Sequence, residues 1–212
     1  MNGVLNIFKP KGMSSFDAVR VVKKVAGTGK VGHTGTLDPE ATGVLPICIG
    51  RATKIIDYIM DSEKVYEVTL KLGIRTTTYD LEGEVLEERD PSHLTEEEIL
   101  NSINSFKGEY SQIPPMYSAL KQNGVRLYEL ARKGIEVERK GRLVNIYNLE
   151  DIKINNPYIS MKVTCSKGTY IRSLCYDIGE KLGVFATMTQ LNRAKTSVFS
   201  QEKSININEL TK

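Results

Sequence analysis

Residues 32–46, GHTGTLDPEATGVLP, form the segment of this chain best suited to chemistry. Glycines at positions 32, 35 and 43 free the backbone for a close approach to a ligand. Asp38 stands in the middle of the segment, before Pro39, and an apolar run follows. A carboxylate that a loop holds beside a rigid strand can act as a nucleophile or as an acid–base group. Because Asp-Pro is also common in plain turns, residue type alone leaves a structural role equally open.

His33 precedes Asp38 by five residues and could serve as a base, as a stacking plate or as an ordinary loop residue. No GxSxG segment occurs, so a serine hydrolase is not indicated. Residues 27–32, GTGKVG, match the GxGxxG pattern, but that site needs a strand before the glycines and a helix after them. Here the predicted helix comes first, so the pattern does not indicate a dinucleotide site.

Metal chemistry is not indicated either. The three cysteines, Cys48, Cys165 and Cys175, are widely spaced and odd in number, and no CxxC occurs. His33 and His93 stand far apart in the chain. We therefore expect reduced thiols, no metal site and no cofactor.

Three blocks of the sequence resemble the bacterial tRNA pseudouridine-55 synthases, the TruB family. They read GVLNIFKPKGMSS, GHTGTLDPEATGVLPICIGRATK and CSKGTYIRSLCYDIGEKLG. Two further stretches, KVYEVTLKLGIRTTTYDLEGEV and IPPMYSALKQNGVRLYELARKGIEV, extend the similarity over nearly the whole chain. The resemblance implies a pseudouridine synthase fold and an enzyme that isomerises uridine 55 of the TΨC loop after flipping the base out of its stack.

The resemblance also implies roles for individual residues. The nucleophilic aspartate of the family falls on Asp38, and its arginine falls on Arg172, whose guanidinium can hold the carboxylate ionised by a bidentate pair. Its base-stacking tyrosine falls on Tyr66, whose hydroxyl could also take the C5 proton. The implied catalytic residues are thus Asp38, Tyr66 and Arg172, and the implied substrate contacts are His33, Tyr66, Tyr170 and Leu191. The plain alternatives are a core aromatic at position 66 and a surface arginine at position 172.

Isomerisation of uridine changes no oxidation state and transfers no group to a second molecule, which agrees with the expected lack of a cofactor. The carboxylate could attack C1′, add to C6 or promote a glycal intermediate, and the residues do not choose among these routes. A catalytically silent RNA-binding module is the alternative from another class, and intact Asp38, Tyr66 and Arg172 favour the enzyme. A guide-RNA-dependent synthase is disfavoured by the short chain.

Charge is distributed unevenly, although the formal net charge is only +3. Residues 61–110 hold 5 Lys and Arg against 13 Asp and Glu, whereas the flanking segments are basic. Residues 121–142 carry 7 Lys and Arg against 3 Glu, and we expect this strip to contact the RNA backbone. The expected partner is the TΨC stem-loop of tRNA. We expect a monomer with no membrane contact and no obligate protein partner.

Periodicity predicts the elements that must position these residues. Strands outnumber helices and do not alternate with them regularly, so the expected class is α+β, with a mixed, largely antiparallel central sheet and flanking helices. The expected helices span residues 15–26, 52–60, 96–106, 127–133 and 168–182, with a short one at the end. The expected strands span residues 3–8, 44–49, 65–72, 84–88, 135–138, 143–154 and 158–165, with another near Ser197. Residues 28–43 are expected to be a loop, and Asn123-Gly124 a hairpin turn.

The chain has 212 residues, of which 40% are hydrophobic and 26% are charged, as in an ordinary globular protein. No apolar run approaches the ~20 residues of a membrane span, and the N-terminus lacks a signal pattern, so we expect a cytoplasmic protein. We expect residues 1–212 to form one catalytic domain, without the small C-terminal RNA-binding domain usual in the family.

Overall fold

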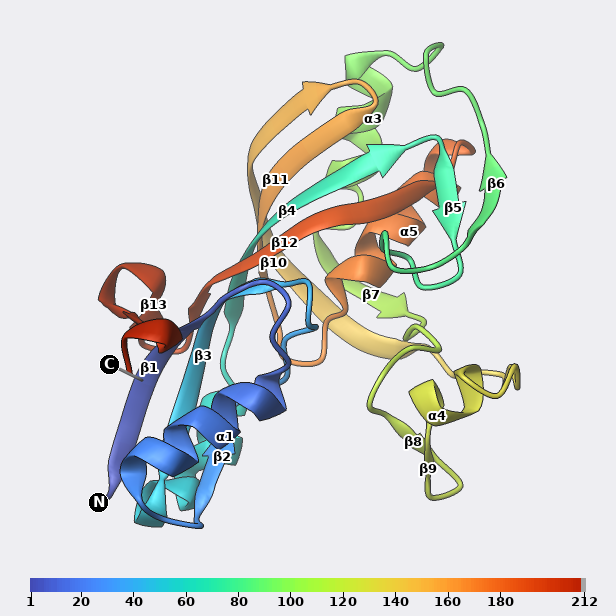
Figure 1. Cartoon of the computed structure of the whole chain (residues 1–212). Coiled ribbons are helices and arrows are strands. Elements are labelled where there is room, and N and C mark those ends of the chain that lie inside the picture. The colour runs from blue at the N-terminus through green and yellow to red at the C-terminus, as the bar shows by residue number, and fades with distance from the viewer. Residues whose placement is uncertain (211–212) are drawn as a thin grey trace. The chain divides into compact units, whose positions relative to one another are not determined.

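The computed structural model describes residues 1–210 and contains one large mixed sheet with helices beside it (Figure 1). The helices are α1 (Ser15–Ala26), α2 (Ile56–Met60), α3 (Glu96–Asn104), α4 (Leu127–Ala131) and α5 (Ile171–Leu182), with 3₁₀ helices η1 (Gly50–Ile55), η2 (Gln201–Lys203) and η3 (Ile207–Glu209). The strands are β1 (Gly3–Lys9), β2 (Val31–His33), β3 (Thr42–Ile49), β4 (Lys64–Leu72), β5 (Ile74–Thr76), β6 (Val85–Glu88), β7 (Gly108–Gln112), β8 (Lys121–Gln122), β9 (Val125–Arg126), β10 (Arg142–Asn155), β11 (Tyr158–Cys165), β12 (Ala186–Thr196), β13 (Phe199–Ser200) and β14 (Ile205–Asn206).

The large sheet has the strand order β14-β1-β3-β12-β4-β11-β10-β7, with β2 beside β3 and β13 beside β12. β1 pairs antiparallel with β3, and β10 with β7, whereas β12 runs parallel to β3 and β14 parallel to β1. The expected α+β class with a mixed sheet is therefore confirmed.

The chain forms two compact units. Unit 1 comprises residues 1–67, 162–167 and 190–212, and unit 2 comprises residues 68–161 and 168–189. Three strands, β4, β11 and β12, each begin in one unit and end in the other.

Unit 1 packs α1 against β2 and β3. Ser14 caps α1 by accepting a hydrogen bond from the Asp17 amide, the Asp17 carboxylate accepts from the Ser14 amide, and Gly27 ends the helix in the left-handed region. The buried face of the helix, Ala18, Val19 and Val22, meets a core that also holds Ile7, Leu45 and Ile47. Burial of these side chains from both sides fixes the strand that follows the Asp38 loop.

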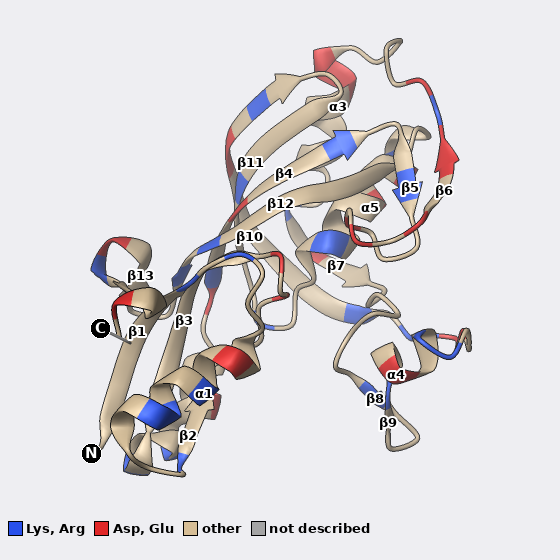
Figure 2. Cartoon of the chain, in the orientation of Figure 1, with Lys and Arg blue, Asp and Glu red and all other residues tan. Residues whose placement is uncertain are grey.

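Unit 2 contains the acidic residues of segment 61–110 that follow β4, and several of them lie on β6, on α3 and on the loop between β5 and β6 (Figure 2). Helix α3 starts with a second capping box, formed by Thr95 and Glu98, and contacts α5. Helix α5 lies so close to the start of β12 that a Cβ at Gly179 would come 2.0 Å from the Ala186 amide nitrogen. Only glycine permits this approach, which sets the start of β12.

Most predicted elements are confirmed, including the hairpin at Asn123-Gly124, where both residues have positive φ. Strand β11 buries Ile159, Met161, Val163 and Cys165 on one face, as its alternation predicts. Among residues 1–210, no helix is both long and apolar enough to span a membrane.

Five predictions are wrong in detail. The loop expected over residues 28–43 contains the short strand β2, because the residues of β2 pair with β3. Residues 52–60 form a 3₁₀ helix followed by one short α-helix, and the helix expected from position 168 begins only at Ile171. Residues 135–138 form no strand, because this exposed stretch has no partner strand in the described sheets. Ser197 lies in the turn between β12 and β13, with φ of 54°, so a turn between two strands stands where one strand was expected.

The Ser14 cap gives a direct test of this local folding. We expect Ser14→Ala to lower the free energy of unfolding by about 1 kcal/mol, because the amide of Asp17 loses its acceptor. Chemical denaturation would measure the change, with Ser14→Thr as the matched control that keeps a capping oxygen. Equal midpoints for Ser14→Ala and the unchanged chain would contradict the assigned cap.

Candidate functional site

The loop that carries Asp38 is fastened to unit 1 on several sides. The Leu37 amide donates to the Ser15 hydroxyl at 2.8 Å, and that hydroxyl donates back to the Leu37 carbonyl at 2.9 Å. The Pro39 carbonyl accepts from the Gly12 amide at 2.9 Å, and the Thr34 amide donates to the Pro46 carbonyl at 3.1 Å. The half-buried Asp38 is thus held between residues whose backbone positions are fixed.

Lys9 supports the same loop from β1. Its side chain is fully buried, and its ammonium donates to the carbonyls of Pro10 at 2.9 Å, Met13 at 2.6 Å and Pro39 at 3.1 Å. The pKa of Lys9 is lowered to about 8, chiefly by burial. The charges of Asp38 and Glu40 oppose this shift, and the charge of Arg193 adds to it. All three ammonium donors are therefore used, two within the first sequence block and one to join that block to the Asp38 loop.

Arg193 approaches the loop from β12, where it pairs in register with Gly43. It is 2% exposed, and its guanidinium donates to the Val44 carbonyl at 2.8 Å and to the Gly35 carbonyl at 3.1 Å. Gly43 has φ of +116°, and a Cβ there would come 2.3 Å from the Arg193 carbonyl oxygen. Glycine at position 43 is thus required for the parallel pairing that brings Arg193 to the loop.

His33 lies on β2, opposite Ile47 of β3. Burial, and next the charge of Arg193, lower the pKa of His33 below its ordinary value, so the imidazole is neutral at pH 7. Its Nδ1 atom is buried and has no hydrogen-bond partner among residues 1–210. One polar atom of the imidazole is therefore available for a bound molecule.

Tyr66 and Leu191 both pack against the core of unit 1. Burial raises the pKa of the Tyr66 phenol, whereas the charge of Arg193 and a hydrogen bond from Arg193 lower it. Leu191 stands two residues before Arg193, so both side chains lie on the same face of β12. The ring of Tyr66 therefore packs in the core, whereas its hydroxyl interacts with Arg193, which also holds the Asp38 loop.

Arg172 lies in the first turn of α5, in unit 2, and is only 6% exposed. Its guanidinium forms a salt bridge with Asp80, itself 7% exposed, with Nη1 at 3.3 Å from Oδ2. It also donates to the carbonyls of Thr78 at 3.2 Å and Tyr117 at 3.0 Å. A surface arginine is therefore excluded at this position, and two segments of unit 2, around Asp80 and Tyr117, hold the planar donor fork.

Tyr170 is the residue at which α5 starts. Gln112, at the end of β7, binds the backbone of Tyr170 twice: its Oε1 accepts from the Tyr170 amide at 2.8 Å, and its Nε2 donates to the Tyr170 carbonyl at 3.1 Å. Ser173 donates to the Ile113 carbonyl at 2.9 Å. These contacts fix the beginning of α5 and hence the direction in which Arg172 points.

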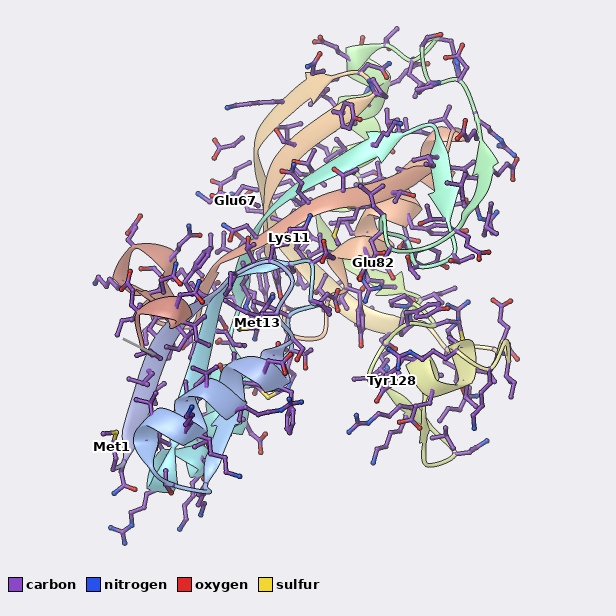
Figure 3. The ribbon with its side chains drawn as sticks, viewed as in Figure 1. Met1, Lys11, Met13, Glu67, Glu82 and Tyr128 are labelled. Carbon is purple, nitrogen blue, oxygen red and sulfur yellow. The ribbon has the colours of Figure 1, made fainter. Side chains whose placement is uncertain are left out.

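The basic strip, residues 121–142, belongs to unit 2 and includes β8, β9 and α4. Six of its seven cations are exposed, the exception being Arg139, which donates to the Pro114 carbonyl at 3.2 Å. Tyr128, labelled in Figure 3, has Arg126 and Arg132 near its ring at 5.8 and 5.4 Å from the centroid. The strip thus presents positive charge and an aromatic ring on the surface, as a phosphate-binding segment requires.

The six predicted site residues fall into two groups. Asp38, His33, Tyr66 and Leu191 lie in unit 1, and Tyr170 and Arg172 are near neighbours at the start of α5 in unit 2. Sequence reasoning missed Lys9, Arg193 and Asp80, which are buried charges. A signal existed for Arg193, since a charged residue two positions after Leu191 must share its face of the strand.

The GxGxxG segment follows α1 and precedes β2, the reverse of the order that a dinucleotide site needs, so its exclusion is confirmed. Residues 1–210 hold no group of three or more His, Cys, Asp or Glu that could bind a metal ion.

Comparison with known proteins places this geometry in a family. Residues 23–171 match the model of the TruB family pseudouridylate synthase N-terminal domain, and residues 172–212 match the model of the tRNA pseudouridylate synthase B C-terminal domain. A protein named tRNA pseudouridine synthase B from Clostridium perfringens is 67% identical over all 212 residues, which cover 72% of its length. Its namesake from Clostridium tetani is 64% identical over 99% of this chain and 73% of its own length.

Solved structures of pseudouridine synthases are also similar to this chain. A chain of a Cbf5-Nop10-Gar1 complex superposes with a TM-score of 0.76 and 31% identity, over 97% of this chain and 52% of that one. This chain thus spans about half the length of that solved relative. A pseudouridylate synthase with 16% identity shares the fold, with a TM-score of 0.50 over 100% of this chain and 74% of its own. The fold is that of the pseudouridine synthases. The chain belongs to the TruB family.

The buried pair of Arg172 and Asp80 predicts strong coupling. We expect Asp80→Asn to lower the free energy of unfolding by about 3 kcal/mol, because the buried guanidinium of Arg172 loses its salt bridge with Asp80. The double variant Asp80→Asn/Arg172→Gln should lose less than the sum of the two single variants, since each single variant already removes this interaction. Urea denaturation of all four proteins would measure the coupling, and strictly additive losses would contradict it.

Proposed function

We propose that this chain is a tRNA pseudouridine synthase that isomerises uridine 55 in the TΨC loop, with Asp38 as its nucleophile. The observation that carries the proposal is the fastening of the Asp38 loop by two buried cations, Lys9 and Arg193, beside a neutral His33. A turn-forming aspartate needs no such support. The 67% identity to a protein named tRNA pseudouridine synthase B favours this substrate over a guide-dependent one.

The reaction balances within one nucleotide. The N1–C1′ bond of uridine breaks, the uracil turns, and a C5–C1′ bond forms. C5 loses its proton and N1 gains one, so no second substrate is needed. A carboxylate near C1′ and C6 can form the covalent intermediate by either route, and a confined pocket keeps the detached base in place.

Four residues form the proposed pocket for the base. Tyr66 would stack on the uracil, and its hydroxyl would receive the C5 proton. His33 would take the space left by the flipped base, with its free Nδ1 as a hydrogen-bonding atom. Tyr170 and Leu191 would line the walls.

Arg172 is the third proposed catalytic residue. Its fork is held at fixed orientation by Asp80 and by two carbonyls, which suits a guanidinium whose task is to keep a carboxylate ionised. In this proposal Arg172 serves Asp38, and the functional coupling of the two is open to measurement.

The proposal also covers the domain organisation, the location and the partners of the protein. Residues 1–212 would form the catalytic domain, acting in the cytoplasm on tRNA as a monomer without an obligate protein partner. The basic strip, residues 121–142, would contact the phosphates of the tRNA backbone.

The direct test is incubation of the protein with an unmodified tRNA transcript, followed by nucleoside analysis. Pseudouridine is expected from this transcript and not from one with cytidine at position 55. Pseudouridine at another position, or none at all, would reject the proposed site specificity or the proposed activity.

Replacement of the nucleophile separates chemistry from binding. We expect Asp38→Asn to reduce conversion below detection, because the amide keeps the size of the carboxylate but lacks its charge and nucleophilicity. Its affinity for tRNA should stay within about tenfold, or roughly 1.4 kcal/mol, of that of the unchanged chain. Single-turnover kinetics and filter binding would measure both quantities. Conversion by Asp38→Asn at a near-normal rate would leave Asp38 with the role of a turn residue.

The basic strip predicts the salt dependence of binding. Arg132→Ala combined with Lys133→Ala should make the slope of log affinity against log salt shallower by roughly 1.4 to 1.8, if each cation meets one phosphate. The matched control replaces one arginine and one lysine outside the strip, Arg89→Ala with Lys107→Ala, both exposed in the acidic segment. An unchanged slope in the first variant, or an equal change in the control, would remove the strip from the RNA interface.

A further inference from the structure

Arg193 is a buried cation that fastens the Asp38 loop, and the proposed chemistry assigns it no step of its own. It is among the largest fully buried side chains of the described residues. A buried guanidinium costs several kcal/mol of desolvation unless its donors are used. The guanidinium donors of Arg193 are used here, because they bond to backbone carbonyls on either side of Asp38.

The guanidinium contacts both sides of the Asp38 loop. It donates to Gly35, three residues before Asp38, and to Val44, six residues after it. One rigid fork thus spans the loop, and β12 supplies it through the pairing of Arg193 with Gly43. A planar group with fixed donor directions can hold two carbonyls in register, whereas a lysine ammonium is a point charge.

The same guanidinium hydrogen-bonds Tyr66 and sets the charge around it. Burial lowers the pKa of His33, Lys9 and Lys64, and the charge of Arg193 acts in the same direction. At Tyr66 burial raises the pKa of the phenol, and the charge of Arg193 opposes that effect. The groups facing Arg193 from β1, β2 and β4 therefore all respond to its charge.

We propose that Arg193 is a positioning residue of this site, which holds the two sides of the Asp38 loop and the hydroxyl of Tyr66 in one register. The inference deepens the proposed function and rests on it. Arg193 touches no substrate atom in this role. It acts through Asp38 and Tyr66, and it keeps His33 neutral.

Two variants of Arg193 separate geometry from charge. Arg193→Lys keeps the charge but loses the fork, and Arg193→Gln keeps one donor but loses the charge. We expect the single-turnover rate constant to fall by about 100-fold in Arg193→Gln and by less in Arg193→Lys, because misplacement of reacting groups by about 1 Å costs on that order. Affinity for tRNA should stay nearly unchanged. Arg89→Gln is the matched control, since Arg89 also donates to a carbonyl, that of Gly183, but lies outside this site.

A readout that does not need activity is the imidazole titration of His33 followed by NMR. In Arg193→Gln the pKa of His33 should rise, because the positive charge that opposes its protonation is gone. In Arg193→Lys it should stay close to its starting value. The exposed His93 provides a second imidazole signal in the same spectrum, which reports on the integrity of the fold.

A double-mutant cycle with Tyr66→Phe tests the link to the hydroxyl. The loss of rate from Arg193→Gln should be smaller in the Tyr66→Phe background than in the unchanged chain, because the hydroxyl that Arg193 holds is already absent. Independent, multiplying losses would overturn the proposed link. A merely structural Arg193 would lower the unfolding midpoint of Arg193→Gln but leave the rate constant of the folded protein intact, which would overturn the inference.

The experiments distinguish a failure of the proposed function from a failure of the inference about Arg193. An unchanged chain that forms no pseudouridine would reject the proposed function, while the His33 titration and the amide exchange of Leu37 and Ala41 would still decide the inference. Faster exchange of these two amides in Arg193→Gln supports the proposed positioning role of Arg193. Unaltered exchange together with an unaltered His33 pKa overturns it.

Discussion

Burial of two cations against the carbonyl oxygens of one loop is the constraint on which the site of unit 1 depends. Lys9 and Arg193 reach the Asp38 loop from β1 and β12, and their donors end on Pro39, Gly35 and Val44. Because a buried charge is tolerated only when its donors are satisfied, the loop and the two strands must adopt one mutual arrangement. The glycine at position 43 permits that arrangement, since any side chain there would collide with the backbone of β12.

Electrostatics follows from this packing. Burial lowers the pKa values of His33 and Lys9, and the positive charge of Arg193 adds to this effect. Such a site suits a reaction in which a carboxylate must remain ionised and an imidazole must remain neutral. In unit 2 the buried charge of Arg172 is stabilised by a salt bridge with Asp80 and by hydrogen bonds to backbone carbonyls.

The three sequence blocks are distributed over both units. The first and second blocks meet within unit 1, where Gly12 and Ser15 bind the Asp38 loop. The third block starts α5 in unit 2, where Gln112 fixes the backbone of Tyr170. Each block therefore combines residues with proposed chemical roles and residues that hold the backbone around them.

Local signals in the sequence predict most of the individual elements, and the family resemblance selects Asp38 as the candidate nucleophile. Capping residues define the start of α1 and α3, alternation defines β4 and β11, and Asn123-Gly124 defines a hairpin, because these signals act over a few neighbouring residues. Tertiary structure decided the rest. Whether residues 135–138 pair depends on a partner strand, and whether Arg193, Lys9 and Asp80 are buried depends on contacts from distant segments. From the sequence alone, a charged residue is expected to be exposed to solvent. Only the folded chain supplies the carbonyls and counter-charges that make its burial stable.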